Sequence, residues 1–386
     1  MARPKLAFTT LILVFAVLSP VASEAIRAED DYLRMRQVRI IDEHGFGRPI
    51  EAASLLLPVS WQAESSVRWT GDVGCPENAV HLALKAQSPD GRLGFEVFPN
   101  HVWKWADDPA AQQAAQQAMA PFGVRGCDVL PPYDAAGYLQ DVFLPRWRPG
   151  STLIDLGSVA ELAQALQLEQ KALAVSTGQP AWIETDFDVA LALIETPRAE
   201  GVDEEWLLVT VMRTMISPPA MGYGLPPLPR SYSMIALSPF AARAPKGELE
   251  KHDRLFEVIH RSFRTDPRWD AGVAQVQQNI AAMQRRGIAE RSRIIAESNR
   301  EIGAIIEQAY QARQAGQDRS FERQIRALRG VESWIDPLTR ASVQLTSGYR
   351  GAWSNGLGDY ILSDNPDFQP EQVVPGTWTP LKPDEP

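Results

Sequence analysis

The chain has 386 residues, of which 45% are hydrophobic and 11 are tryptophan, and this composition excludes an intrinsically disordered polymer. Its formal net charge is −10. An acidic balance argues against sequence-independent binding to nucleic acid or electrostatic binding to anionic lipid, because phosphate contacts need clustered Lys and Arg. We therefore expect no nucleic-acid partner.

Residues 1–23 have the organisation of a secretory signal peptide. Arg3 and Lys5 precede an apolar run over residues 6–18, and residues 20–23 supply a helix break and small side chains for cleavage. The run is too short for a stable membrane span, and no later run of eighteen apolar residues follows. We expect a periplasmic or secreted protein with no integral membrane segment after processing; the alternative is a short uncleaved anchor.

Cys75 and Cys127 are the only cysteines. In an oxidising compartment, an even count of two predicts one disulfide. Closing a loop of about fifty residues would restrict the unfolded chain by roughly 4 kcal/mol. A metal site would need more soft ligands nearby, and a catalytic thiol would stand alone beside a histidine, so the structural bond is favoured.

Residues 37–265 carry strand and helix signals that predict one α+β domain, an antiparallel sheet with helices mainly on one side. The turn signal at residues 88–91, Ser-Pro-Asp-Gly, lies between two apolar stretches and predicts a hairpin, because Pro presets one dihedral and Gly permits the other. Long strands are expected at residues 183–195 and 206–216. An amphipathic helix is expected at residues 159–174, with Leu162, Leu166 and Leu173 on one face.

Several of these features together resemble the PsbP-like family. They are the strand-rich start, the Leu-Pro-x-x-Trp segment at residues 57–61, the Pro-Asp-Gly turn and the closing helix at residues 249–263. The resemblance covers about 230 residues and implies a small α+β protein that acts as an extrinsic or accessory subunit, by binding and supporting assembly. It carries over no catalytic residues.

Residues 268–316 predict a long amphipathic helix. Apolar side chains recur there with a seven-residue period, which is typical of a coiled coil, at Ile288, Ile295, Ile302 and, between repeats, Ile305. A straight helix of this length would reach about 70 Å. The pattern favours contact with a protein partner or self-association; the alternative is a helical hairpin that folds back at Gly287.

Strand signals return at residues 330–365 and predict a small antiparallel β module, too small to hold a core alone. Its Asn355-Gly356 pair favours a two-residue hairpin bend. Residues 353–364 resemble the C-terminal segment of exported bacterial proteins of unknown function, and Trp353 and Tyr360 there are candidate interaction residues. Residues 366–386 contain six prolines and predict an extended tail.

Few side chains form a pattern that a reaction needs. Glu184, Asp186 and Asp188 alternate along a strand, so their carboxylates share one face and are candidates for an acid and base of glycosidase type. A solvated strand face produces the same pattern and is favoured. His252 and His260 share a helix with nearby glutamates, but ordinary helix charge pairing explains these, so no metal or cofactor is expected.

These observations favour an exported, non-enzymatic binding or assembly-accessory protein of the bacterial envelope. One alternative is a hydrolase of envelope polysaccharide or peptide that uses the strand carboxylates. Another is a carbohydrate-binding protein that uses the C-terminal aromatic residues.

Overall fold

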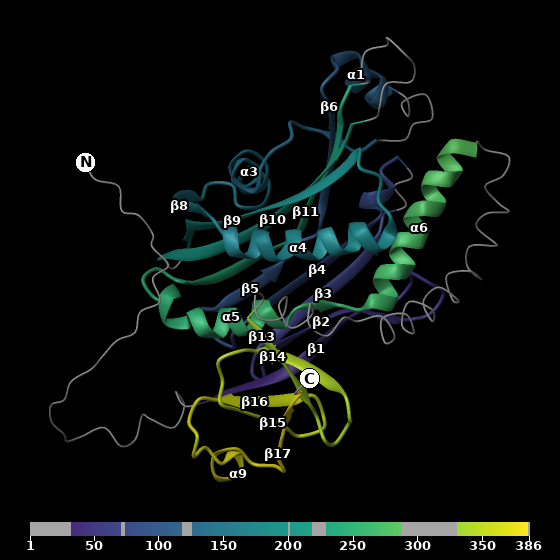
Figure 1. Ribbon diagram of the computed structural model, residues 1–386. Coiled ribbons are helices and arrows are strands. Elements are labelled where there is room, and N and C mark those ends of the chain that lie inside the picture. The colour runs from purple at the N-terminus through teal and green to yellow at the C-terminus, as the bar shows by residue number, and fades with distance from the viewer. Residues whose placement is uncertain are drawn as a thin grey trace.

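The computed structural model describes residues 32–70, 74–117, 126–199, 201–217, 229–286 and 330–384. These residues form mostly antiparallel β structure in three sheets, with short helices packed around them (Figure 1). The prediction of one sheet with helices mainly on one side, followed by a long helix, is therefore wrong. The predicted signal peptide lies outside the described residues.

The largest sheet has nine strands, and its centre is formed by long antiparallel strands that extend beyond their neighbours (Figure 1). The order is β3-β4-β5-β11-β10-β9-β8, while β6 pairs with β11 and the short β7 runs parallel to β6. The predicted turn at residues 88–91 joins β4 to β5, with Gly91 at φ +70°, and is confirmed. The strands are β3 (Gln62–Trp69), β4 (Val80–Gln87), β5 (Gly94–Val97), β6 (His101–Ala106), β7 (Asp128–Val129), β8 (Thr152–Ser158), β9 (Ile183–Arg198), β10 (Gly201–Ile216) and β11 (Ser231–Pro245).

The second sheet joins the two ends of the described chain. Its order is β12-β2-β1-β16-β15-β17, and Leu33 of β1 lies opposite Leu362 of β16. The predicted module at residues 330–365 therefore docks on the main domain by sharing a sheet with it. The predicted two-residue bend at Asn355-Gly356 is instead a longer loop over residues 355–358. A third sheet has the order β14-β13-β18. The strands are β1 (Leu33–Asp42), β2 (Ile50–Pro58), β12 (Arg264–Thr265), β13 (Val331–Ile335), β14 (Ser342–Thr346), β15 (Gly351–Ser354), β16 (Asp359–Ser363), β17 (Thr379–Pro380) and β18 (Lys382–Pro383).

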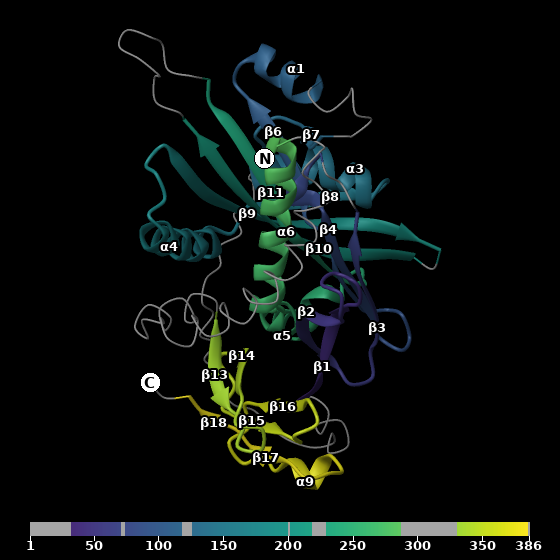
Figure 2. The same cartoon turned by 90° about the vertical axis from the view of Figure 1, so that its right-hand side faces the viewer.

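The helices of the described residues are short and lie around the sheets. In Figure 1, α5 lies between the nine-stranded sheet and the C-terminal strands, and it contacts β2 and β14. Figure 2 shows α6 running lengthwise along the molecule, with α4 to one side of it. The helices are η1 (Pro76–Asn78), α1 (Pro109–Gln117), α2 (Ala135–Tyr138), η3 (Leu139–Phe143), α3 (Leu144–Trp147), α4 (Ala160–Thr177), η4 (Leu249–His252), α5 (Asp253–Ser262), α6 (Pro267–Arg286) and α9 (Pro370–Val373).

The predicted long helix at residues 268–316 is described only over its first part. That part is α6, which has 20 residues, and no longer helix occurs in the described residues. The remaining residues of the prediction, 287–316, lie outside them. Among the helices of the described residues, none is both long enough and apolar enough to span a membrane.

The predicted extended tail is instead packed against the C-terminal strands over its described residues. Phe368, Val374 and Trp378 are buried together with Ile361 of β16, and Leu381 is buried in the main core. The prolines are compatible with this packing because they lie at the ends of short elements, where no backbone N–H is needed. The helix α9 begins at Pro370, and β17 ends at Pro380.

A carboxylate at the end of β1 joins three parts of the fold. Asp42 is fully buried, and its Oδ2 accepts hydrogen bonds of 2.9 Å from the indole Nε1 of both Trp69 in β3 and Trp269 in α6. Its Oδ1 accepts hydrogen bonds from the backbone N–H groups of His44 and Gly45. Gly45 is required by this close approach, since a Cβ there would lie 2.2 Å from Oδ2.

We predict that Asp42→Ala lowers the free energy of unfolding by about 3–5 kcal/mol, because it leaves two indole donors and two backbone donors without their acceptor. Urea denaturation followed by tryptophan fluorescence measures this change. The exposed neighbouring variant Glu43→Ala is the control and should shift the value by no more than about 0.5 kcal/mol. Equal midpoints for the two variants would contradict the role given to Asp42.

Candidate functional site

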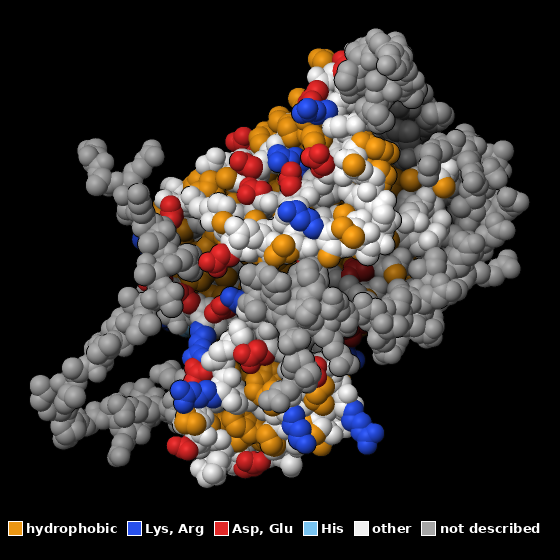
Figure 3. Space-filling model, viewed as in Figure 1, with side chains coloured by type: hydrophobic (Ala, Val, Ile, Leu, Met, Phe, Trp, Pro, Cys, Tyr) orange, Lys and Arg blue, Asp and Glu red, His pale blue; other side chains and the backbone are white. Residues whose placement is uncertain are grey.

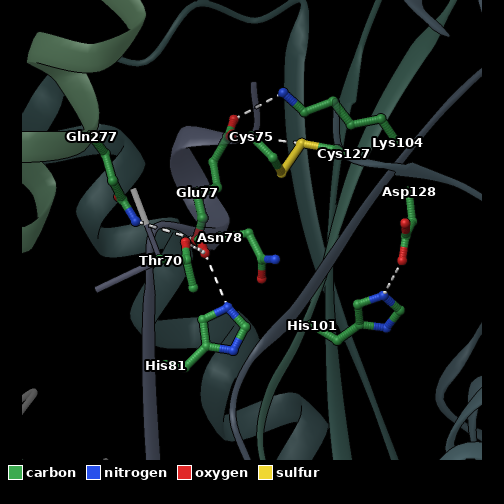
Figure 4. The surroundings of a disulfide bond; sticks show 10 residues. All are labelled: Thr70, Cys75, Glu77, Asn78, His81, His101, Lys104, Cys127, Asp128 and Gln277. Carbon is green, nitrogen blue, oxygen red and sulfur yellow. Dashed lines mark hydrogen bonds and ion pairs between the residues drawn. A yellow bond between two sulfur atoms is a disulfide. The ribbon is translucent and has the colours of Figure 1, made fainter. Parts of the chain in front are cut away.

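The predicted disulfide is present in the structure. Cys75 and Cys127 are bonded with their Cα atoms 4.7 Å apart (Figure 4). Cys75 immediately precedes η1, and Cys127 immediately precedes β7. The bond therefore ties two short elements that have few backbone hydrogen bonds of their own.

On the η1 side, the disulfide positions Glu77. Its Oε1 accepts a 3.0 Å hydrogen bond from Lys104 Nζ of β6, and its backbone oxygen accepts one from Gln277 Nε2 of α6 (Figure 4). η1 is thus a bridge between the nine-stranded sheet and α6.

On the β7 side, the disulfide positions Asp128 beside a buried histidine. Asp128 Oδ2 lies 3.0 Å from His101 Nε2 (Figure 4). Tyr138 OH lies 3.0 Å from His101 Nδ1. Tyr138 stacks on Trp103 with ring centroids 4.9 Å apart. The position of His101 at the start of β6 gives no sign in the sequence of these contacts.

The environment of this Asp–His–Tyr chain is that of a structural network. Burial lowers the pKa of His101, although Asp128 acts in the opposite direction, and burial raises the pKa of Tyr138. Both side chains are buried. Both imidazole nitrogens of His101 are thus engaged, and the hydrogen bonds link β7 to β6 and α2.

The described residues contain one group of potential metal ligands, and it includes both sulfur atoms of the disulfide. The ligand atoms of Cys75, Glu77 and Cys127 lie within 4.8 Å of one another. Metal ligation by cysteine requires the thiolate, and both sulfur atoms are occupied by the disulfide. The group therefore fits a covalent tether and not a metal centre.

The three strand carboxylates occupy one face of β9 but have different environments. Glu184 is exposed. Asp186 Oδ2 accepts hydrogen bonds from Arg213 Nη2 at 2.9 Å and from Arg213 Nε at 3.1 Å. Asp188 Oδ2 accepts a 2.8 Å hydrogen bond from the backbone N–H of Ala135, at the start of α2.

A surface hollow of about 350 Å³ lies beside these strands. The hollow contains the carboxylates of Asp186 and Asp188 and, in addition, that of Asp134. Asp134 caps α2 by accepting a 2.7 Å hydrogen bond from the backbone N–H of Gly137. All three carboxylates of the hollow thus hold α2 or pair with Arg213. The hollow is lined by Tyr133, Asp134, Asp186, Phe187, Asp188, Val211 and Arg213.

The predicted interaction residues fall into two groups. Ile288, Ile295, Ile302 and Ile305 lie outside the described residues. Trp353 and Tyr360 belong to the second sheet and are packed against the protein itself: the Trp353 ring lies 5.4 Å from the Phe368 ring, and Tyr360 is buried in the main core. Tyr360 therefore offers no surface on which a sugar ring or a partner could stack.

The helix predicted to be amphipathic, α4, exposes apolar side chains beside the sheet. Only Ala165 of its 18 residues is buried. Leu173, predicted to share a face with Leu162 and Leu166, is 54% exposed, and Val175 is 84% exposed. Figure 3 shows hydrophobic side chains at the surface over α4, and Leu168 and Trp182 are exposed as well.

The position of α4 is fixed by a polar contact with β9. Gln167 Nε2 donates to the backbone oxygen of Thr185, and Gln167 Oε1 accepts from the backbone N–H of Phe187. The strand β8 does not pair with the first part of β9. There the side-chain amide of Gln167 makes the backbone hydrogen bonds that a neighbouring strand would make. With this polar contact holding α4, Leu168 and Leu173 are exposed, whereas Leu162 and Leu166 are half-buried.

No family model and no curated protein matches this sequence. The PsbP-like resemblance stays a prediction.

We predict that replacing both cysteines (Cys75→Ser with Cys127→Ser) lowers the free energy of unfolding by roughly 4 kcal/mol, because the unfolded chain loses a constraint over 52 residues. Urea denaturation measures the change. Reductant should destabilise the wild type by a similar amount and leave the double variant unchanged. A reductant effect on the double variant would show that the loss has another origin.

His260 of α5 yields a prediction on pH. It packs edge-on against Phe240, with ring centroids 4.7 Å apart, and burial, assisted by Arg261 and Arg264, lowers its pKa from 6.5 to about 4. Between these values the unfolded chain binds a proton that the folded chain does not. The free energy of unfolding should therefore fall as pH falls through this window, by at most about 3 kcal/mol.

The measurement is urea denaturation at pH 7 and pH 5 for the wild type and His260→Gln, which should lose this part of the pH dependence. The variant is needed because a second group on the same helix also titrates in this range. Burial raises the pKa of Asp253 to about 6, so its protonation makes the free energy of unfolding rise as pH falls. His44→Gln, at an exposed position, is the control. A wild-type pH dependence retained by His260→Gln would refute the assignment.

Proposed function

We propose that this protein is an exported, non-catalytic binding protein that docks a partner protein on α4 and the start of β9. One observation carries the proposal: an 18-residue helix with a single buried residue exposes Leu168, Leu173 and Val175. Helices in folded proteins gain most of their stability from burying an apolar face. Leu168 and Val175, seven residues apart, lie on one side of this helix. Exposed apolar side chains are typical of interaction sites, and Trp182, exposed just before β9, is an aromatic of the type found there.

Two features support export. Residues 1–23 have the charge and apolar pattern of a cleaved signal, and the Cys75–Cys127 disulfide requires an oxidising compartment to persist. The expected location is the periplasm or the exterior of the cell, in keeping with an assembly-accessory role at the bacterial envelope.

The hydrolase alternative retains one favourable feature, the hollow beside β9 and β10. Its carboxylates, however, are neutralised by Arg213 or cap α2, which are structural uses. The carbohydrate-binding alternative has less support, because Tyr360 is buried and Trp353 packs on Phe368. Binding of a protein partner is the function that the described surface favours.

We predict that Leu173→Ser with Val175→Ser abolishes recovery of the partner from envelope extracts of the native cell, because interface contacts depend on a few buried apolar anchors. Co-purification with wild-type and variant protein, together with light scattering for self-association, measures the effect. The free energy of unfolding should change by less than about 1 kcal/mol, since both side chains are exposed.

The matched control is Glu161→Ser with Lys171→Ser, which alters two exposed polar positions of the same helix and should leave recovery unchanged. A variant at residues 173 and 175 that recovers the same proteins as the wild type would remove α4 as the docking surface.

A further inference from the structure

The strand β3 forms one edge of the nine-stranded sheet. Along its inner side it pairs with β4 through its whole length, from Gln62 to Trp69, with no break in register. Among the residues that the structure describes, no strand lies beyond β3. The backbone N–H and C=O groups on the outer side of β3 are therefore placed to pair with a further strand.

β3 also lacks two features by which edge strands commonly avoid such pairing. It contains no proline and no bulge, whereas β8, at the other end of the sheet order, has a bulge between Leu153 and Asp155. One face of β3 is held in place, because Ala63, Val67 and Trp69 pack against the main core. A regular edge strand held in this way is a template for strand addition.

The opposite face of β3 carries two exposed charges, those of Glu64 and Arg68. Glu64 stands at the end of a row of alternating charge that crosses the sheet. It lies opposite Lys85 of β4, and Lys85 lies opposite Glu96 of β5, with its Nζ 3.9 Å from Glu96 Oε1. The next position in this row, beside Glu64 on an added strand, calls for a basic side chain.

We propose that β3 pairs with β3 of a second copy of this chain, antiparallel and around a two-fold axis that passes between the two Ser66 residues. In this register Glu64 of each copy lies opposite Arg68 of the other, so the symmetry forms two cross-strand ion pairs. The second copy thereby supplies the basic side chain that the row of charges calls for.

The charges select this register over the neighbouring ones. An axis at Glu64 or at Arg68 would place two like charges opposite each other, and an axis at Ser65 or Val67 would place neither charge opposite another charge. In Figure 2, β3 lies on the side of the molecule opposite α4. The inference therefore does not depend on the use of α4 as a docking surface.

The test is the mass of the whole mature protein in solution, measured by sedimentation velocity over a range of concentrations. The wild type should form a dimer. Glu64→Arg alone or Arg68→Glu alone should raise the dissociation constant of the dimer by at least about tenfold, because two ion pairs become two like-charge pairs. An equimolar mixture of the two variants should recover the dimer, since every charge of one variant then lies opposite the other sign.

The matched control is Glu161→Arg, which changes the net charge by the same amount at an exposed position of α4 and should remain dimeric. Leu173→Ser with Val175→Ser should also remain dimeric, which separates this test from that of α4. Circular dichroism of each variant verifies that the fold is retained.

Ser66→Cys reports the register directly. Opposite Cα atoms of an antiparallel pair lie about 4.5–5.5 Å apart, which is within the span of a disulfide, so mild oxidation should link the two copies. Ser65→Cys is the control and should not link them, because its two copies would be displaced by two residues along the paired strands.

A monomeric wild type would overturn the inference. A dimer that both single charge variants retain, or a mixture of these variants that stays monomeric, would do the same. Linkage through residue 65 in place of residue 66 would show another register, and loss of the dimer only with Leu173→Ser and Val175→Ser would place the contact on α4.

Discussion

The fold depends on the burial of the Asp42 carboxylate between two tryptophan side chains. A lone buried carboxylate would be strongly unfavourable, so it is stable only where several donors converge. Here these donors come from the chain just after β1, from β3 and from α6, which are up to 227 residues apart in sequence. The requirement for donors therefore fixes the relative positions of the second sheet, the nine-stranded sheet and α6.

Other buried charges act as joints of the same kind. Glu205 of β10 is fully buried and lies 2.7 Å from Arg148, whose guanidinium also lies 3.3 Å from Glu96 of β5 and above the Phe98 ring. Asp336 and Ser354, which are both buried, join the turn after β13 to the turn after β15 through a 2.8 Å hydrogen bond. In each case the polar group joins segments distant in sequence, and each lies within the packed interior, away from the hollow beside β9.

This use of polar groups bears on function. The carboxylates and the histidine that would draw attention in a search for catalysis, Asp186, Asp188 and His101, are engaged by Arg213, an amide of α2 and the Asp128–Tyr138 pair. Apolar side chains are exposed instead on α4. This arrangement is the basis of the binding function proposed above.

The sequence by itself determined the features that rest on neighbouring residues or on simple counting: the hairpin at residues 88–91, the long strands β9 and β10, and the pairing of Cys75 with Cys127. It also placed Glu184, Asp186 and Asp188 on one strand face, because side chains alternate in any strand. Only the tertiary structure decided that β16 lies beside β1, that Leu173 faces solvent and that His101 and Tyr360 are buried. These outcomes depend on strand pairing and packing between segments far apart in the chain, which local periodicity does not encode.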